Sequence, residues 1–161
     1  MSDESTALPA DLTGLVPLVT RQHGFAQVVS SLPRHRSATI DGAWNSAAPL
    51  AVAGLLKGAP STLLVVLPRE KELDAFALDV ASLTGITPHI LPAWETLPQE
   101  LRMSDPILGS RLRILKALES SAPPPVVITT VQALLQPVPS RSARAAATRT
   151  WRVGDELDLD D

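Results

Sequence analysis

The sequence predicts an α/β fold, a three-layer α/β/α sandwich in which helices cover both faces of a mainly parallel sheet. Three short apolar runs, at 62–67, 88–91 and 126–130, have the length and character of buried strands. Patterns of helical period separate the runs, and strands that alternate with helices form parallel βαβ units with right-handed crossovers. The chain has 161 residues, 45% of them apolar, which is enough for one domain with its own core.

The first run, 62–67, is apolar almost throughout, which is typical of a strand that is buried on both faces. The helix predicted after it, at 69–83, is amphipathic, and Gly85 is placed to end it in the left-handed conformation. The apolar face of this helix, which we expect to pack on the sheet, consists of Leu73, Phe76, Ala77, Val80 and Leu83.

A second crossover helix is predicted to begin at Asp105 and Pro106, a capping carboxylate followed by proline at the first helical position. Its expected buried stripe is Leu108, Leu112, Leu115 and Leu118, with Arg111, Arg113 and Lys116 on the outer face. The strand at 126–130 follows, and then a short helix at 131–135. Near the N-terminus, interrupted helical spacing from Leu12 to Leu32 predicts two short helices.

The loop from Asp41 to Leu50 lies between a predicted strand at 38–40 and an apolar helix that runs to Lys57. Strand, tight loop and helix is the context of a P-loop, whose template is G-x-x-x-x-G-K-[ST]. Its backbone cradles phosphates, its lysine reaches the β- and γ-phosphates, and its hydroxyl binds Mg²⁺. Taken alone, the segment is equally compatible with an ordinary helix start that has proline in its first turn.

Aligned with this template, the loop keeps the frame of a P-loop and lacks its chemistry. Gly42 takes the position of the first glycine and Ala47 that of the second. Ala48 stands at the lysine position without an ammonium group, and Pro49 stands at the Ser/Thr position without a hydroxyl. Pro49 also has no N–H, so one donor of the helix start is missing. We therefore expect no nucleotide and no Mg²⁺ at this loop.

Composition argues against several functional classes. The net charge of −3 gives no general attraction to nucleic acid or to an anionic membrane. No cysteine is present, which leaves no disulfide framework and no thiolate metal site and suits a cytoplasmic protein. No apolar run reaches the ~20 residues that span a bilayer. Residues 1–10 are predicted to be a disordered lead-in, and their polar, acidic start is unlike a signal peptide.

A few other side chains are candidates for a site. Trp94, Glu95 and Arg111 form a candidate interaction surface, although packing at the sheet edge is the more common role of a large aromatic such as Trp94. Arg111 is expected to pair with a carboxylate on the helix surface. The three histidines lie on separate elements without ligand spacing, so no metal site is predicted. No catalytic residue is predicted, because no pair of carboxylates is buried or positioned for acid–base chemistry.

Six segments follow one another in the order found in a known family. They are the degenerate P-loop at 41–50, Leu64–Pro68, Leu91–Pro98, Asp105–Leu115, Val126–Gln136 and Val153–Leu159. Together they closely resemble the N-terminal region of bacterial transcription-repair coupling factors (Mfd), the part that is similar to the excision-repair subunit UvrB. The resemblance extends from about Leu15 to Asp161. Its most specific part is Trp-Glu-Thr-Leu-Pro at 94–98, with Arg-Leu at 111–112 and Leu-Leu-Gln at 134–136.

The resemblance implies that the chain is a fragment. Residues 11–139 would be the first half of a degenerate RecA-like domain, of the P-loop helicase type, and 140–161 a linker and the start of an inserted second domain. In the family that second domain docks the damage-recognition subunit UvrA. The motor that uses ATP and Mg²⁺ on double-stranded DNA, and the domain that binds RNA polymerase, lie downstream.

The resemblance also bears on the loop. The N-terminal P-loop of the family is itself degenerate, and Ala48 and Pro49 agree with that pattern. Asn45 replaces the usual glycine, which weakens even a residual phosphate cradle. The resemblance thus implies a vestigial loop, made of Gly42, Asn45, Ser46, Ala48 and Pro49.

Two functions of different classes follow. The first is a non-catalytic scaffold and interaction region of a transcription-repair coupling factor, which couples removal of RNA polymerase stalled at DNA lesions to recruitment of nucleotide excision repair. The alternative is an ATP-binding helicase or NTPase domain with an unorthodox P-loop. A free-standing α/β domain for a small molecule is a third, against which the acidic run at 155–161 argues because no complete element follows it.

Overall fold

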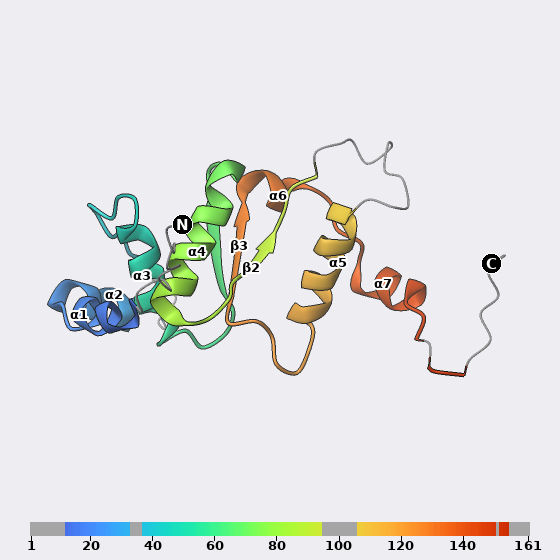
Figure 1. Cartoon of the computed structure of the whole chain (residues 1–161), viewed down its shortest axis with the longest axis horizontal. Coiled ribbons are helices and arrows are strands. Elements are labelled where there is room, and N and C mark those ends of the chain that lie inside the picture. The colour runs from blue at the N-terminus through green and yellow to red at the C-terminus, as the bar shows by residue number, and fades with distance from the viewer. Residues whose placement is uncertain (1–11, 33–36, 95–105, 151, 155–161) are drawn as a thin grey trace, which may run out of the picture.

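The computed structural model describes residues 12–32, 37–94, 106–150 and 152–154. Its centre is a parallel sheet in the order β1-β3-β2, formed by β1 (Leu63–Leu67), β2 (His89–Leu91) and β3 (Val126–Thr130). In Figure 1, α3 (Ala47–Leu56) and α4 (Leu73–Thr84) lie on one side of the sheet, and α5 (Pro106–Leu118) lies on the other. The predicted α/β sandwich with a parallel sheet is therefore confirmed.

Shorter helices complete the described part of the chain. They are η1 (Thr13–Leu15), α1 (Val16–Thr20), α2 (His23–Ser31), η3 (Glu70–Glu72), α6 (Val131–Leu135) and α7 (Arg141–Ala147). The two short N-terminal helices and the helix at 131–135 agree with the prediction, whereas α7 forms where only a linker is expected. Phe25 of α2 approaches α3 so closely that a Cβ on Gly54 would lie 2.6 Å from its ring. Among the described helices, none combines the length and apolar composition needed to cross a membrane.

The predicted apolar face of α4 is confirmed. Leu73, Ala77, Val80 and Leu83 are buried, and Phe76 packs against the same core as a half-buried side chain. This face meets Val126 and Ile128 of β3, and each fully buried aliphatic side chain contributes about 1.5–3 kcal/mol. Gly85 ends the helix with φ +70°, and its N–H donates to the Ala81 carbonyl at 2.8 Å, as the sequence predicts.

The prediction for the buried face of α5 is wrong. The residues that α5 buries are Arg111 and Ile114, and Ile114 packs on Leu91 and Val127. No member of the predicted leucine stripe is fully buried, since Leu108, Leu112 and Leu115 are half-buried and Leu118 is exposed. Apolar residues occur at helical spacing on two adjoining faces of this helix, and the sequence alone therefore does not decide which face turns inward.

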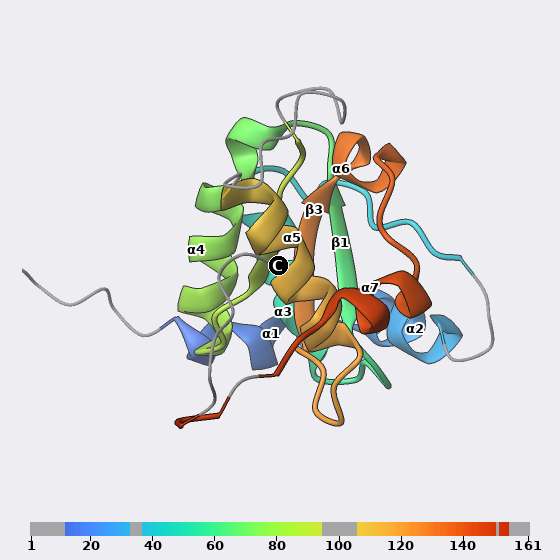
Figure 2. The same ribbon diagram turned by 90° about the vertical axis from the view of Figure 1, so that its right-hand side faces the viewer.

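The strand predicted at 62–67 forms as β1, but its predicted burial on both faces is wrong, and the strand predicted at 38–40 does not form. β1 is an edge strand that pairs only with β3 within the described residues, and its Leu64 and Val66 side chains are 49% and 41% exposed instead of buried. Figure 2 shows the reason, because α5 lies over β3 and leaves β1 to its side. The segment 37–40 is exposed and forms no strand. A strand needs a neighbour for its backbone groups, and no described strand pairs with this segment.

Candidate functional site

The carboxyl end of the sheet carries both groups of candidate residues. In parallel sheets, ligands usually bind in the crevice outside this end of the strands. β1 leads here into Pro68 and Arg69, which face the loop at 41–49 across a groove. β2 leads into Pro92 and Trp94, and β3 leads directly into α6, whose first turn is capped by the Thr130 side chain. The predicted P-loop position and the Trp94 segment are thus on the same edge.

The loop at 41–49 bonds mainly to itself. Gly42 and Asn45 both have positive φ, +77° and +48°, which folds the chain into a tight turn before α3. The N–H groups of Ala47 and Ala48 donate to the carbonyls of Trp44 and Asn45 at 3.0 and 3.1 Å. A phosphate-binding loop leaves such N–H groups free for the anion. Two of the donors that a phosphate cradle would need, the N–H groups of Ala47 and Ala48, are therefore already used within this loop.

A groove of about 590 Å³ lies between this loop and the start of α4. Its walls include Trp44, Asn45, Ser46, Ala48 and Pro49 from the loop, and Arg69, Lys71, Glu72 and Phe76 from the segment after β1. Arg69 forms an ion pair with Glu72 at 2.5 Å, which leaves Lys71 as the remaining cation of the groove. The groove has room for a ligand, but Ala48 and Pro49 stand where a P-loop has the lysine and the hydroxyl that hold a triphosphate and its Mg²⁺.

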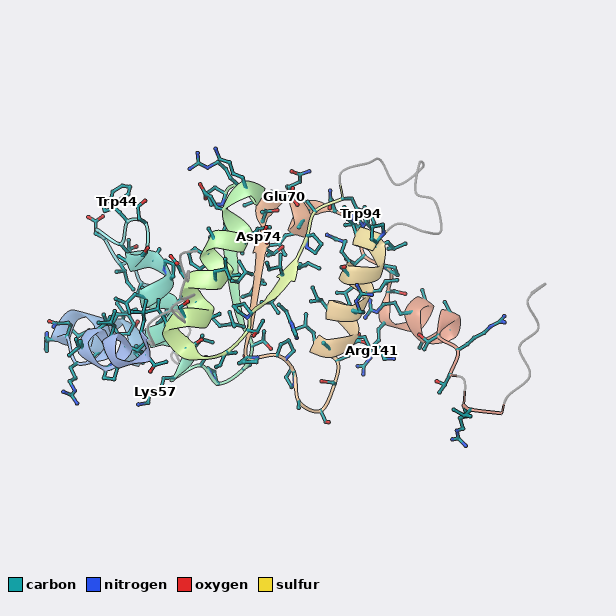
Figure 3. All side chains as sticks on the ribbon, in the orientation of Figure 1. Trp44, Lys57, Glu70, Asp74, Trp94 and Arg141 are labelled. Carbon is teal, nitrogen blue, oxygen red and sulfur yellow. The ribbon has the colours of Figure 1, made fainter. Side chains whose placement is uncertain are left out.

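Trp44 stands at the outer end of the loop (Figure 3), and its relative exposure is 78%. Large aromatics at this level of exposure are uncommon and are enriched where proteins contact partners. Within the described residues, no group of three or more His, Asp or Glu side chains could hold a metal ion. The loop therefore offers shape and an aromatic contact, without groups for metal or phosphate chemistry.

A second cluster is built around Arg111, which is only 1% exposed. Its guanidinium lies over the Trp94 ring, 4.9 Å from the centroid, in cation–π geometry. Arg111 Nη1 donates to the Pro92 carbonyl at 2.6 Å, and Nη2 donates to the Ala133 carbonyl at 3.2 Å. One side chain on α5 therefore ties together the segment after β2 and the helix after β3. Figure 3 places Trp94 beside the start of α5.

Gln136 completes this cluster with its side-chain amide. Its Oε1 accepts from the Trp94 N–H at 2.7 Å and from Arg111 Nη1 at 3.4 Å, and its Nε2 donates to the Trp94 carbonyl at 3.0 Å. The amide thus satisfies both backbone groups of Trp94, as a neighbouring strand would. We call Trp94, Arg111 and Gln136 the arginine cluster.

Among the described residues, only neutral groups contact the charged guanidinium of Arg111. No carboxylate forms an ion pair with it in the described part of the chain; carbonyl oxygens and an aromatic face surround it instead. Burial lowers the pKa of Arg111 because desolvation disfavours the charged form. Arg111 Nε and Trp94 Nε1 are buried without a partner among these residues. The arginine cluster therefore links α5 to the segment after β2 and to the segment after β3.

The structure corrects the site prediction in one respect. Arg111 lies in the interior and not on the outer face of its helix, so it does not form a surface ion pair there. Trp94 is also inside, 7% exposed, and Glu95 lies outside the described residues. Gln136 was not predicted as a site residue. The available signal was its place in the Leu-Leu-Gln segment, one of the three segments most specific to the resemblance.

Comparison with known proteins agrees with the family resemblance found in the sequence. No protein-family model matches the chain. Transcription-repair-coupling factors of Mycobacterium bovis and Mycobacterium tuberculosis are each 34% identical to it, over 92% of this chain. The chain is therefore similar to one part of these transcription-repair-coupling factors. The resemblance predicted from the sequence is thereby confirmed, and the chain spans 12% of the length of each of these relatives.

The arginine cluster brings together the segments on which the sequence resemblance to transcription-repair-coupling factors depends most. Its members come from the three segments that are most specific to the resemblance to transcription-repair-coupling factors, around 94, 111 and 136. In the fold these segments meet around a single buried charge. Residues that contact one another in this way depend on one another energetically, which gives a physical reason for their occurring together.

Proposed function

We propose that this chain is the N-terminal, non-catalytic scaffold region of a transcription-repair coupling factor. In this proposal the intact parent couples removal of RNA polymerase stalled at DNA lesions to recruitment of excision repair in the cytoplasm. Contacts to RNA polymerase and double-stranded DNA, and the use of ATP and Mg²⁺, belong to the rest of the parent protein. The observation that carries the proposal is the loop at 41–49, where Ala48 and Pro49 replace the two functional side chains of a P-loop.

Loop geometry supports the non-catalytic part of the proposal. The N–H groups of Ala47 and Ala48 are bonded to carbonyls of the loop, and Pro49 has no N–H to offer. Phosphoryl transfer depends almost entirely on positioning and on electrostatic stabilisation by such donors, a lysine and a metal ion. The alternative, an NTPase with an unorthodox P-loop, would have to supply all of these from the groove beside the loop.

The scaffold part of the proposal is supported by the open side of β1. Its outer edge has no strand partner among the described residues, and Leu64 and Val66 leave apolar surface uncovered on one face. Unpaired strand edges and bare apolar faces are usually covered in native proteins. We infer that a later part of the parent polypeptide adds to this edge, and that the inserted second domain, held in place by this framework, docks UvrA.

This proposal predicts a separation of two activities in the intact parent. We expect a parent that lacks residues 1–161 to lose most of its UvrA binding, measured by surface plasmon resonance. Its DNA-stimulated ATP hydrolysis should persist, because the groups that use ATP lie elsewhere. The intact parent is the control. Unchanged UvrA binding in the shortened protein would contradict the scaffold role, and loss of hydrolysis with retained UvrA binding would favour the NTPase alternative.

A further inference from the structure

A groove with basic edges runs between α5 and α7. Figures 1 and 2 both show α7 beside the C-terminal half of α5, on the side away from the sheet. The cavity between them measures about 900 Å³. From α5 its lining includes Gly109, Leu112, Arg113 and Lys116, and from α7 it includes Ala143 and Ala147. These residues recur at spacings of three and four, so each helix turns one continuous face to the groove.

The floor of the groove is apolar, and most of its side chains are small. The side chains of Leu112, Ala143 and Ala147 consist only of carbon, and Gly109 contributes no side chain. A Cβ added at Gly109 would lie 3.7 Å from Arg113 Nη1. Small residues let a third helix come close to both walls, because side-chain size sets the interaxial distance. An apolar groove between two helices is the usual receptor for the apolar face of an amphipathic helix.

The edges of the groove are positively charged. Arg113 and Lys116 are exposed on α5, and Arg113 Nη2 donates to a neutral group, the Ser110 hydroxyl, at 3.0 Å. On the other edge, Glu119 binds Arg144 and lies 3.8 Å from Arg141, which ties α7 to α5 and neutralises one cation. Figure 3 shows Arg141 near this end of α5. The local excess of positive charge contrasts with the net charge of −3 of the whole chain.

We propose that this groove docks an acidic amphipathic helix of a partner protein. Apolar side chains of the helix would lie on the floor, and carboxylates at its flanks would face Arg113, Lys116 and Arg141. A nucleic acid fits less well, because the interior offers carbon where phosphates need cations and because Glu119 lies in the lining. The inference does not rest on UvrA recruitment, since it follows from the groove alone.

Fluorescence anisotropy with a labelled acidic amphipathic peptide of about three helical turns (~11 residues) tests the proposal. The whole chain should bind this peptide saturably at low ionic strength. The pair Arg113→Glu and Lys116→Glu should weaken binding by about tenfold or more, because two attractions become repulsions. The matched pair Arg21→Glu and Lys57→Glu makes the same charge change outside the groove and should alter binding by less than about twofold. Leu112→Ser should weaken binding without changing the charge.

Three results would overturn the proposal. The first is the absence of saturable binding by the wild-type chain. The second is equal binding of a peptide with the same composition but a scrambled apolar stripe, which would reduce the effect to non-specific charge attraction. The third is that another ligand uses the groove. Duplex DNA would bind more tightly than the peptide, or the chain would self-associate in sedimentation experiments, and the Arg113→Glu and Lys116→Glu pair would abolish that binding. Circular dichroism of each variant separates loss of binding from loss of fold.

Discussion

Replacing Arg111 with alanine is expected to lower the free energy of unfolding by about 3 kcal/mol or more. The change leaves the buried carbonyl of Ala133 and the half-buried carbonyl of Pro92 without their donor, and each unsatisfied buried group costs about 1–3 kcal/mol. It also removes the side chain that packs on Trp94. For a domain of this size the melting temperature should fall by roughly 6–12 °C. Urea denaturation followed by circular dichroism measures the change.

The matched control for this prediction is Arg113→Ala, two residues further along the same helix. Arg113 is exposed, and its guanidinium donates to the Ser110 hydroxyl in an exposed hydrogen bond, so its removal should change stability by less than about 0.5 kcal/mol. Arg111→Met, which keeps packing volume and loses the hydrogen bonds, should fall between the two. Equal effects of Arg111→Ala and Arg113→Ala would contradict the structural role of the arginine cluster.

Replacing Trp94 with alanine should be at least as costly, about 3–5 kcal/mol, because it removes a buried aromatic side chain and opens a cavity. Trp44→Ala is the matched control, since the same substitution at a 78% exposed position should cost less than about 0.5 kcal/mol. Urea denaturation of both variants decides the comparison, with circular dichroism as the signal because both changes remove a tryptophan.

A double-mutant cycle extends the Trp94 prediction to the contact itself. The combined Trp94→Ala and Arg111→Ala protein should be more stable than the sum of the single effects implies, by about 1 kcal/mol, since the cation–π contact is lost only once. Strict additivity would show that the two side chains stabilise the fold independently, contrary to the geometry of the cluster.

Sequence patterns predict an element and its buried face correctly where the element carries a single clear signal. α4 has a single apolar face and a glycine at its end, and both were predicted correctly. The parallel sheet follows from the alternation of strands and helices and is confirmed. The patterns failed where the outcome depends on neighbours: α5 has two adjoining apolar faces, β1 lacks a helix over one face, and the segment at 38–40 lacks a strand partner.

The loop at 41–49 and the arginine cluster also differ in how far the sequence predicts them. The missing side chains of the loop could be predicted directly, because Ala48 and Pro49 are visible in the sequence. The arginine cluster could not, because a buried arginine without a carboxylate partner contradicts the usual preference for exposed or paired arginine. Only the fold shows that backbone carbonyls from two distant segments and the Gln136 amide meet the guanidinium.

Isothermal titration of the chain with ATP, in the presence and absence of Mg²⁺, tests the central claim most directly. The claim is that a loop with the outline of a P-loop has lost the groups that bind a nucleotide, and it predicts no saturable heat in either titration. Saturable, Mg²⁺-dependent binding with a Kd below about 1 mM, abolished by Gly42→Val in a variant that keeps its fold, would contradict it.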